Sequence, residues 1–313
     1  MTKTTNNITP PLSSAKVTTN SINFILIAVL LDAIGLGIIV PVIPNLLTEL
    51  TGSPLNEAAL HGGWLTFCYA IMQFIFMPII GALSDAYGRR RVLLISLFCL
   101  GFDYLFMAIA PTVAFLYIGR LIAGATGATY GTANAYIADI AAPEERAQKF
   151  GMIGAAFGIG FVLGPTIGGI LGHFGPRVPF YVAAALALAN GFYGLIFVPE
   201  SLAPEHRRPF SWARANPFGV LAKITALPKL GWFLFAMFLF SAAHFVYPSS
   251  FSFFAYEKFK WGPFETGMAL GAFGFASAVV QGGLIRIAIP KLGMIKCAFI
   301  GILMNATAYI GLS

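Results

Sequence analysis

The sequence predicts an all-α membrane protein, for three reasons. Hydrophobic residues make up 58% of the 313 residues and charged residues only 10%, whereas soluble domains carry about 25% charged residues. Mostly apolar runs follow one another along the whole chain, and each approaches the roughly 20 residues that a helix needs to cross a bilayer. The basic residues gather on one side of the predicted membrane, which indicates topology rather than a nucleic-acid surface.

The apolar runs predict nine spans at about 22–46, 63–83, 92–110, 114–139, 150–172, 178–198, 231–254, 264–288 and 295–313. With the N-terminus in the cytoplasm, the loops after the second, fourth, sixth and eighth spans hold most of the nineteen basic residues. Cytoplasmic loops are enriched in Lys and Arg. We therefore expect a multi-pass protein of the inner (plasma) membrane with a cytoplasmic N-terminus.

Polar intervals divide the chain into four parts. Residues 1–21 are polar and predict a disordered cytoplasmic tail, and residues 22–198 form a six-helix transmembrane half. The longest polar interval, 199–230, interleaves basic residues with prolines and predicts a cytoplasmic linker. Residues 231–313 hold about three further transmembrane helices.

The stretch 81–91, between the second and third spans, holds four charges and two glycines. A generic loop on the positive side of the membrane would explain its arginines, but not the positions of Gly81, Asp85 and Gly88. The pattern G-x-L-S-D-x-x-G-R-R-R resembles the signature loop between helices 2 and 3 of the major facilitator superfamily of secondary transporters. The resemblance implies the major facilitator fold. It also implies a cytoplasmic gate formed by Gly81, Asp85, Gly88, Arg89 and Arg90, with Asp139 from the end of the fourth span.

Three charges lie more than five residues from either end of a predicted span: Asp32 in the first, Asp103 in the third and Arg120 in the fourth. Ionisable groups in a bilayer are costly, so each is a candidate functional residue. A carboxylic acid in a low-dielectric cavity can exchange a proton near neutral pH, as a proton-coupled carrier requires. A structural Asp–Arg pair that only fixes helix packing explains the residue types equally well.

Two segments resemble the tetracycline/proton antiporter branch of the superfamily. Residues 31–44, Leu-Asp-Ala-Ile-Gly-Leu-Gly-Ile-Ile-Val-Pro-Val-Ile-Pro, are similar to its first helix, and residues 119–128, Gly-Arg-Leu-Ile-Ala-Gly-Ala-Thr-Gly-Ala, to its fourth. The resemblance implies that Asp32, Asp103 and Arg120 handle protons or substrate. Gln73, in the second span, is a further candidate for the same site.

The fifth span carries glycines at helical spacing around a proline, namely Gly160, Gly164, Pro165, Gly168 and Gly169. Such glycines allow close helix contact, and the proline is expected to kink the helix. Small residues and prolines are also ordinary in membrane helices. The pattern resembles the antiporter motif of drug-exporting facilitators, which favours export over import.

A complete superfamily member has six helices in each half, so the end at Ser313 predicts a truncated or partial chain. Tetracycline exporters carry an acidic residue in helix 9 and a histidine in helix 8, where this sequence has Asn305 and Ser277. The substrate therefore stays open.

No nucleotide-binding phosphate loop, metal-ligand cluster or nucleophile–base motif occurs in the sequence. We therefore expect no enzyme, no cofactor and no bound metal. The predicted function is proton-coupled efflux of an amphipathic, drug-like molecule by alternating access, and the partners are this substrate, protons and the bilayer. The alternatives are a facilitator that imports a small metabolite and a truncated, non-transporting membrane protein.

Overall fold

The computed structural model describes residues 19–219, 228–280 and 284–312. Five helices in these ranges are long and apolar enough to cross a membrane: α1 (Thr19–Ile39), α3 (Leu55–Tyr87), α4 (Arg89–Ala108), α7 (Arg146–Gly172) and α8 (Val178–Phe197). Of the tail predicted at 1–21, residues 1–18 lie outside the described residues. Residues 19–21 already belong to α1, so the predicted tail extends too far.

The first predicted span is broken, which corrects the continuous helix expected over 22–46. A tight turn at 40–42 separates α1 from α2 (Ile43–Thr51). Pro41 lies in this turn and Pro44 in the first turn of α2. Proline has no N–H to donate within a helix and is tolerated mainly in the first turn, so these two positions account for the break.

The fourth predicted span is also broken, near its middle. Helix α5 (Val113–Thr126) ends before Gly127, and α6 (Thr129–Ile140) begins after Ala128. Glycine favours the helix less than alanine by about 1 kcal/mol, and Gly124 and Gly127 flank the end of α5. The break divides the span into two half-helices.

The later part of the chain contains α11 (Pro228–Phe259), α12 (Pro263–Val279), α13 (Ile285–Leu292) and α14 (Met294–Leu312). The predicted eighth span, 264–288, passes through residues 281–283, which lie outside the described residues. The predicted linker, 199–230, contains the short helices η1 (Pro204–His206) and α9 (Trp212–Ala215), and α11 already begins inside it. Residues 220–227 of this linker are not described.

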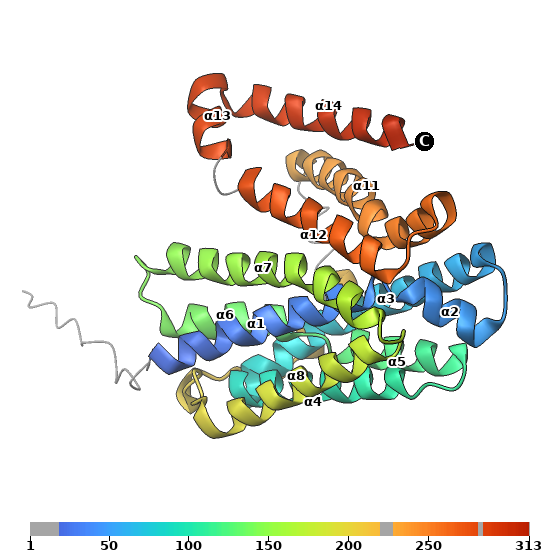
Figure 1. Ribbon diagram of the computed structural model, residues 1–313. Coiled ribbons are helices and arrows are strands. Elements are labelled where there is room, and N and C mark those ends of the chain that lie inside the picture. The colour runs from blue at the N-terminus through green and yellow to red at the C-terminus, as the bar shows by residue number, and fades with distance from the viewer. Residues whose placement is uncertain (1–18, 220–227, 281–283, 313) are drawn as a thin grey trace, which may run out of the picture.

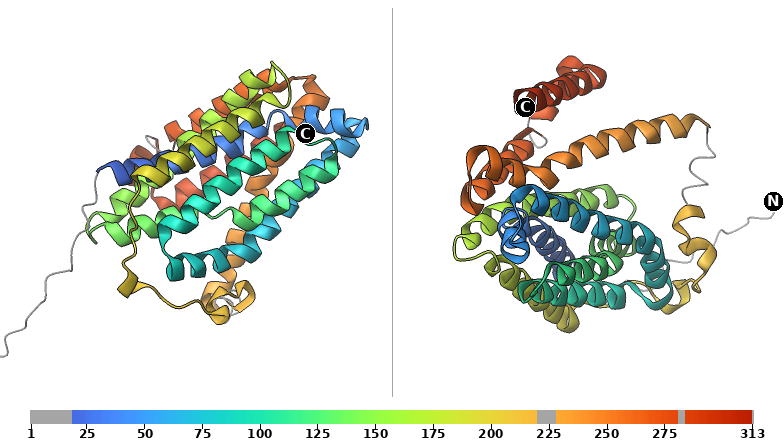
Figure 2. Two further views of the ribbon diagram at one scale, coloured as in Figure 1. Left: turned by 90° about the horizontal axis from the view of Figure 1, so that it is seen from below. Right: turned by 90° about the vertical axis from the view of Figure 1, so that its right-hand side faces the viewer.

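Helices α1 to α8 form one bundle, in which α7 packs against α1, α4 against α8 and α3 against α5 (Figure 1). Helix α7 also packs along α12 and so connects the bundle to the later helices. Viewed nearly end-on, in the right panel of Figure 2, α13 and α14 lie apart from the bundle. The predicted all-α membrane fold is confirmed.

Two apolar clusters fill the bundle, one toward each end. One contains Phe24, Leu93 and Ile137, near the end where α3 meets α4, and we call this the network end. The other contains Leu46 of α2 and Phe180 near the start of α8, and we call this opposite end of the bundle the far end.

On α1, Asp32 lies between Val29 of the network-end cluster and Ile34 of the far-end cluster, whereas Asp103 on α4 lies between Leu100 and Tyr104 of the far-end cluster. We call Asp32, Asp103 and Arg120, with the polar side chains around them, the polar layer.

Candidate functional site

Asp103 and Arg120 form a buried ion pair in the polar layer. Their helices, α4 and α5, pack side by side. Asp103 Oδ2 lies 2.5 Å from Arg120 Nη2, and the exposed fractions of the two side chains are 0% and 12%. The same nitrogen of Arg120 lies 2.7 Å from Met107 Sδ, and the guanidinium lies 5.5 Å from the ring centroid of Tyr69. The positive charge of Arg120 is therefore balanced locally by Asp103.

Asp32 lies in the same layer but has a different kind of partner. Its half-buried carboxylate accepts a hydrogen bond from the hydroxyl of Thr129, the first residue of α6. No ion pair involves Asp32 within the described residues. The two acids predicted from the sequence are thus unequal: Asp103 is neutralised by an arginine, whereas Asp32 is held by a neutral hydroxyl.

Gln73, on α3, contacts the break in the fourth span. Its Nε2 atom donates to the carbonyl oxygen of Gly127 at 3.2 Å and to the hydroxyl of Tyr69 at 3.3 Å. A Cβ at Gly127 would lie 2.8 Å from the carbonyl oxygen of Ala123 and 3.2 Å from the Tyr69 hydroxyl. Gln73 therefore satisfies a backbone carbonyl where the helix is interrupted, and a larger residue at position 127 has no room.

Three buried polar atoms of the layer have no hydrogen-bond partner among the described residues: Asp103 Oδ1, Arg120 Nε and the Tyr104 hydroxyl. The Tyr104 hydroxyl faces Gly35 on α1, where a Cβ would lie 2.5 Å from it. Gly35 is one helical turn from Asp32. Unsatisfied buried groups are rare and call for an explanation such as a functional role.

The predicted gating loop is almost entirely helical, which corrects its extent. Helix α3 continues to Tyr87 and α4 starts at Arg89, so Gly88 alone separates them. Gly88 has a φ of +104°, in the region that favours glycine. Gly81 and Asp85 lie within α3, and a Cβ at Gly81 would meet nothing within 4 Å. No described residue approaches Gly81 closely enough to require a glycine there.

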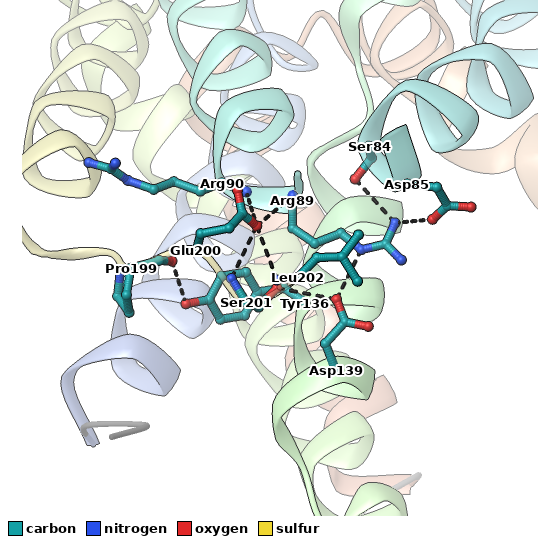
Figure 3. A network of polar contacts seen from close by, with 10 residues as sticks. All are labelled: Ser84, Asp85, Arg89, Arg90, Tyr136, Asp139, Pro199, Glu200, Ser201 and Leu202. Atoms are coloured by element: carbon teal, nitrogen blue, oxygen red, sulfur yellow. Dashed lines mark hydrogen bonds and ion pairs between the residues drawn. The ribbon is translucent and has the colours of Figure 1, made fainter. Parts of the chain in front are cut away.

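Asp85, Arg89 and Asp139 converge at the network end, as Figure 3 shows. Arg89 contacts Asp85 at 2.5 Å, Asp139 at 3.0 Å and the Ser84 hydroxyl at 3.3 Å. The hydroxyl of Ser201 lies 3.2 Å from the same oxygen of Asp139. Arg89 thus links the end of α3 to the end of α6. Arg90 points elsewhere and donates to the carbonyl oxygen of Leu195 on α8.

Glu200 is the network residue that the sequence analysis did not identify. Its Oε1 atom accepts from the backbone nitrogens of Arg89 and Arg90, at 2.8 and 3.3 Å, and from those of Ser201 and Leu202. Gly88 has no side chain that could cap α4, so Glu200 takes this part. Its position directly after a span and a proline was the available signal.

The glycines of α7 face two helices. A Cβ at Gly160 would lie 2.5 Å from the carbonyl oxygen of Leu30, and one at Gly164 would lie 2.8 Å from Gly37 Cα. Gly168 faces the carbonyl group of Ile38 as closely, also on α1. Gly169 faces α12, where its Cβ would lie 2.6 Å from the carbonyl oxygen of Pro263. These positions therefore admit only glycine at the observed spacing.

Pro165 does not interrupt its helix, since α7 runs from Arg146 to Gly172 through it. A Cβ at Gly37, on α1, would lie 2.7 Å from the Cδ atom of the Pro165 ring. Pro165 was expected to kink α7, and the helix nevertheless continues through it without a break. The Pro165 ring contributes to the contact with α1.

The contact between α7 and α12 is confined to part of α7. From Val162 to Gly172, α7 meets Gly274, Gly271, Gly267 and Pro263 in turn. Toward the network end, Cβ atoms at Gly151, Gly154 and Gly158 would meet no atom of the described residues within 4 Å. In Figure 1, α12 accordingly diverges from α7 in that direction. The two parts of the chain are therefore in contact at the far end and apart on this face at the network end.

The chain is similar to known membrane carriers. A sequence profile of the Major Facilitator Superfamily matches residues 25–313. The class C tetracycline resistance protein of Escherichia coli is 37% identical over 291 residues, which are 93% of this chain and 73% of that protein. The class G protein of Vibrio anguillarum is 38% identical over 288 residues, which are 91% and 72% of the two chains.

The fold agrees with solved structures. The crystal structure of the human organic anion transporter MFSD10 superposes with a TM-score of 0.66 at 22% identity, over 84% of this chain and 71% of that one. These proteins are transporters and not enzymes. The predicted family is confirmed: the chain belongs to the Major Facilitator Superfamily of multi-pass membrane transporters and resembles its tetracycline-resistance members.

Proposed function

We propose that the protein is a proton-coupled exporter of amphipathic, drug-like small molecules that works by alternating access in a bacterial inner membrane. The observation that carries this proposal is that the two acids of the polar layer, Asp32 and Asp103, have different kinds of partner. Asp32 has a neutral partner and can gain or lose a proton without breaking an ion pair, whereas Asp103 is bound to Arg120. Asp32 is therefore the proposed proton carrier.

The remaining layer residues receive supporting roles. Arg120 and Asp103 fix the packing of α4 on α5 and set the charge next to Asp32. Gln73 holds the break between α5 and α6. The hydroxyl of Tyr104 is buried against Gly35 of α1 and has no hydrogen-bond partner among the described residues, so it marks the contact of α4 with α1 next to Asp32.

The network end is the proposed cytoplasmic gate. It contains Gly88 and Arg89, together with Arg90, Asp85 and Asp139, and Gly81 lies one helical turn before Asp85. Basic residues are enriched on the cytoplasmic side of membrane proteins, so the N-terminus would also be cytoplasmic. On this proposal, the divergence of α12 from α7 at this end would make the described conformation one that is open to the cytoplasm.

Export is supported by the relatives, which are named for resistance. The two alternatives, import of a metabolite and a non-transporting membrane protein, receive no comparable support. Tetracycline itself is not assigned as the substrate. The positions that carry a histidine and an acid in tetracycline exporters hold Ser277, half-buried on α12, and Asn305, exposed on α14.

The test is drug accumulation in an efflux-deficient bacterial strain that expresses the full gene product. Tetracycline and a set of amphipathic cationic dyes would be compared with and without a protonophore. We expect lower accumulation of at least one compound, abolished by the protonophore and by Asp32→Asn at an equal membrane level. Accumulation unchanged for every compound, or equally lowered by the Asp32→Asn variant, would contradict proton-coupled export through Asp32.

A further inference from the structure

The break in the fourth span places the two ends of one short helix at the two sites already described. Helix α6 begins with Thr129, whose hydroxyl bonds to Asp32. It ends one residue after Asp139, which pairs with Arg89 at 3.0 Å. Ten residues separate Thr129 from Asp139, or about 15 Å at 1.5 Å per residue. One rigid element thus contacts both the proton site and the gate.

Helix α6 is separated from α5 by a defined break. The carbonyl of Gly127 accepts from Gln73 on α3, so α5 ends against a neighbouring helix. The next backbone nitrogen, of Ala128, donates to Thr126 in a tight turn, and the helical pattern resumes from Thr132, which donates to Ala128. Because α5 is fixed on α3 through Gln73, α6 can change its tilt without moving the Arg120 end of the span.

Asp32 is the group to which the first turn of α6 responds. The N-terminus of a helix carries a partial positive charge, and its first N–H groups lack partners within the helix. A charged Asp32 therefore attracts this turn and accepts the Thr129 hydrogen bond, and a proton on Asp32 weakens both interactions. Thr129 itself is only 2% exposed, so water does not replace the lost bond readily.

The other groups around Asp32 do not provide this link. Tyr69 on α3 and Tyr104 on α4 lie within electrostatic range of Asp32 and of the Asp103–Arg120 pair. On its other side, α1 meets the glycine face of α7, which has no titratable group next to Asp32. Tyr69 and Tyr104 lie on the long helices α3 and α4, which also carry Asp85 and Arg89. Unlike α6, these helices have no break between the tyrosine and the gate.

We propose that α6 is a lever that links protonation of Asp32 to the Arg89–Asp139 ion pair, and that Thr129 is the positioning residue that ties the lever to Asp32. This inference rests on the proposed function. Protonation releases the first turn of α6, and the resulting tilt moves Asp139 relative to Arg89. Ser201 bonds to the same oxygen of Asp139, so the linker end follows the movement.

The test measures the gate directly. Spin labels would be attached at Ala142, just past α6, and at Lys291 on α13, both exposed. Cys68, Cys99 and Cys297 would first be replaced by serine. The distance between the two labels would be measured in the purified carrier in nanodiscs. The ratio of the populations with a short and a long distance should change between acid and alkaline pH, and Asp32→Asn should abolish this change.

Thr129→Val removes the hydroxyl and keeps the shape, and it should reduce the pH-driven change in this ratio about tenfold or more, as expected for a lost hydrogen bond to a charged group. Thr129→Ser should restore the change. Thr132→Val, a buried threonine one turn along α6, is the matched control and should leave it intact. Thr129→Ala replaces Thr129→Val if the latter does not reach the membrane.

The two possible failures are distinguishable. A pH-driven change that survives Thr129→Val and Thr129→Ala, but not Asp32→Asn, overturns the lever and leaves proton coupling in place. A change that survives Asp32→Asn as well overturns both this inference and the assignment of Asp32 as the proton carrier.

Discussion

The Oε1 atom of Glu200 lies 2.8 Å from the backbone nitrogen of Arg89. Glu200 follows α8, the last helix of the bundle in sequence, whereas Arg89 is the first residue of α4. The carboxylate thus caps a helix more than a hundred residues away in the chain, at a position where the preceding residue, Gly88, has no side chain. The gate segment and the start of the linker are held together by this cap.

We expect Glu200→Ala to destabilise the protein by about 1 kcal/mol, the usual effect of losing a helix N-cap. Glu200→Gln keeps an acceptor but loses the charge that favours a helix N-terminus, so its effect should be smaller. Thermal unfolding of the purified protein in detergent measures both. Glu205→Ala, on an exposed residue of the same linker, is the control and should leave the melting temperature unchanged. An unchanged melting temperature for Glu200→Ala would contradict the capping role.

Gly88→Ala should be strongly destabilising. The φ of +104° is unfavourable for alanine, and the added Cβ would collide with the Oε2 atom of Glu200. Gly81→Ala provides the matched comparison on α3, because its Cβ meets open space within a helix, where alanine is favoured by about 1 kcal/mol. Membrane level and melting temperature should therefore fall for Gly88→Ala and hold or rise for Gly81→Ala. The reverse order would contradict a positive φ at position 88.

Asp103 and Arg120 should behave as one unit. Removal of one partner from a buried ion pair typically costs about 3–5 kcal/mol, because the other charge is left unpaired. Asp103→Asn and Arg120→Gln should each lower stability strongly, and the double variant should be destabilised by less than the sum. Chemical denaturation of the four proteins gives the coupling energy. Asp32→Asn should be nearly neutral in the same assay, since it leaves no opposite charge unpaired, and additive effects at Asp103 and Arg120 would argue against their pairing.

Gly267→Ala should shift the protein away from the described conformation. Its Cβ would meet the carbonyl oxygen of Pro165 and lie 2.7 Å from Gly169 Cα, so α7 and α12 would have to separate at the far end. We expect faster labelling of a cysteine placed at Thr166, next to Gly271, than in the parent. Gly63→Ala on α3 serves as the control, because a Cβ there meets nothing within 4 Å. Equal labelling rates in all three proteins would contradict a tight contact at Gly267.

The charged residues of the layer were predictable because a charge in an apolar run is conspicuous and costly. Their pairing was not, since it depends on how α4 and α5 turn toward each other. The sequence left open whether the acids are structural or functional, and the different contacts of Asp103 and Asp32 are the basis for our proposal that Asp32 carries the proton. Thr129 and Tyr69 escaped notice because hydroxyl side chains cost little in a membrane helix and are common there.

The helix boundaries show where apolar length alone misleads. The break at Gly127 lies in a run of small residues that contains no charge and no proline, so the sequence analysis predicted one helix where there are two. Glycines did mark the position, but Gly81 and Gly160 occur inside continuous helices as well. Only the partner of the freed carbonyl, Gln73, distinguishes the break, and this partner comes from another helix.

The bare glycines Gly151, Gly154 and Gly158 continue the face of α7 that meets α12 farther along. Val162 and Thr166 follow Gly158 at steps of one helical turn, and only these later residues are in contact. Alternating access requires the network end to close when the far end opens, and an unoccupied glycine strip is the surface onto which a second helix can then settle. Gly158→Leu would consequently leave this conformation as stable as before, because its side chain would meet no described neighbour. It would still stop transport, because the larger side chain would keep the second helix from packing onto α7 when the network end closes.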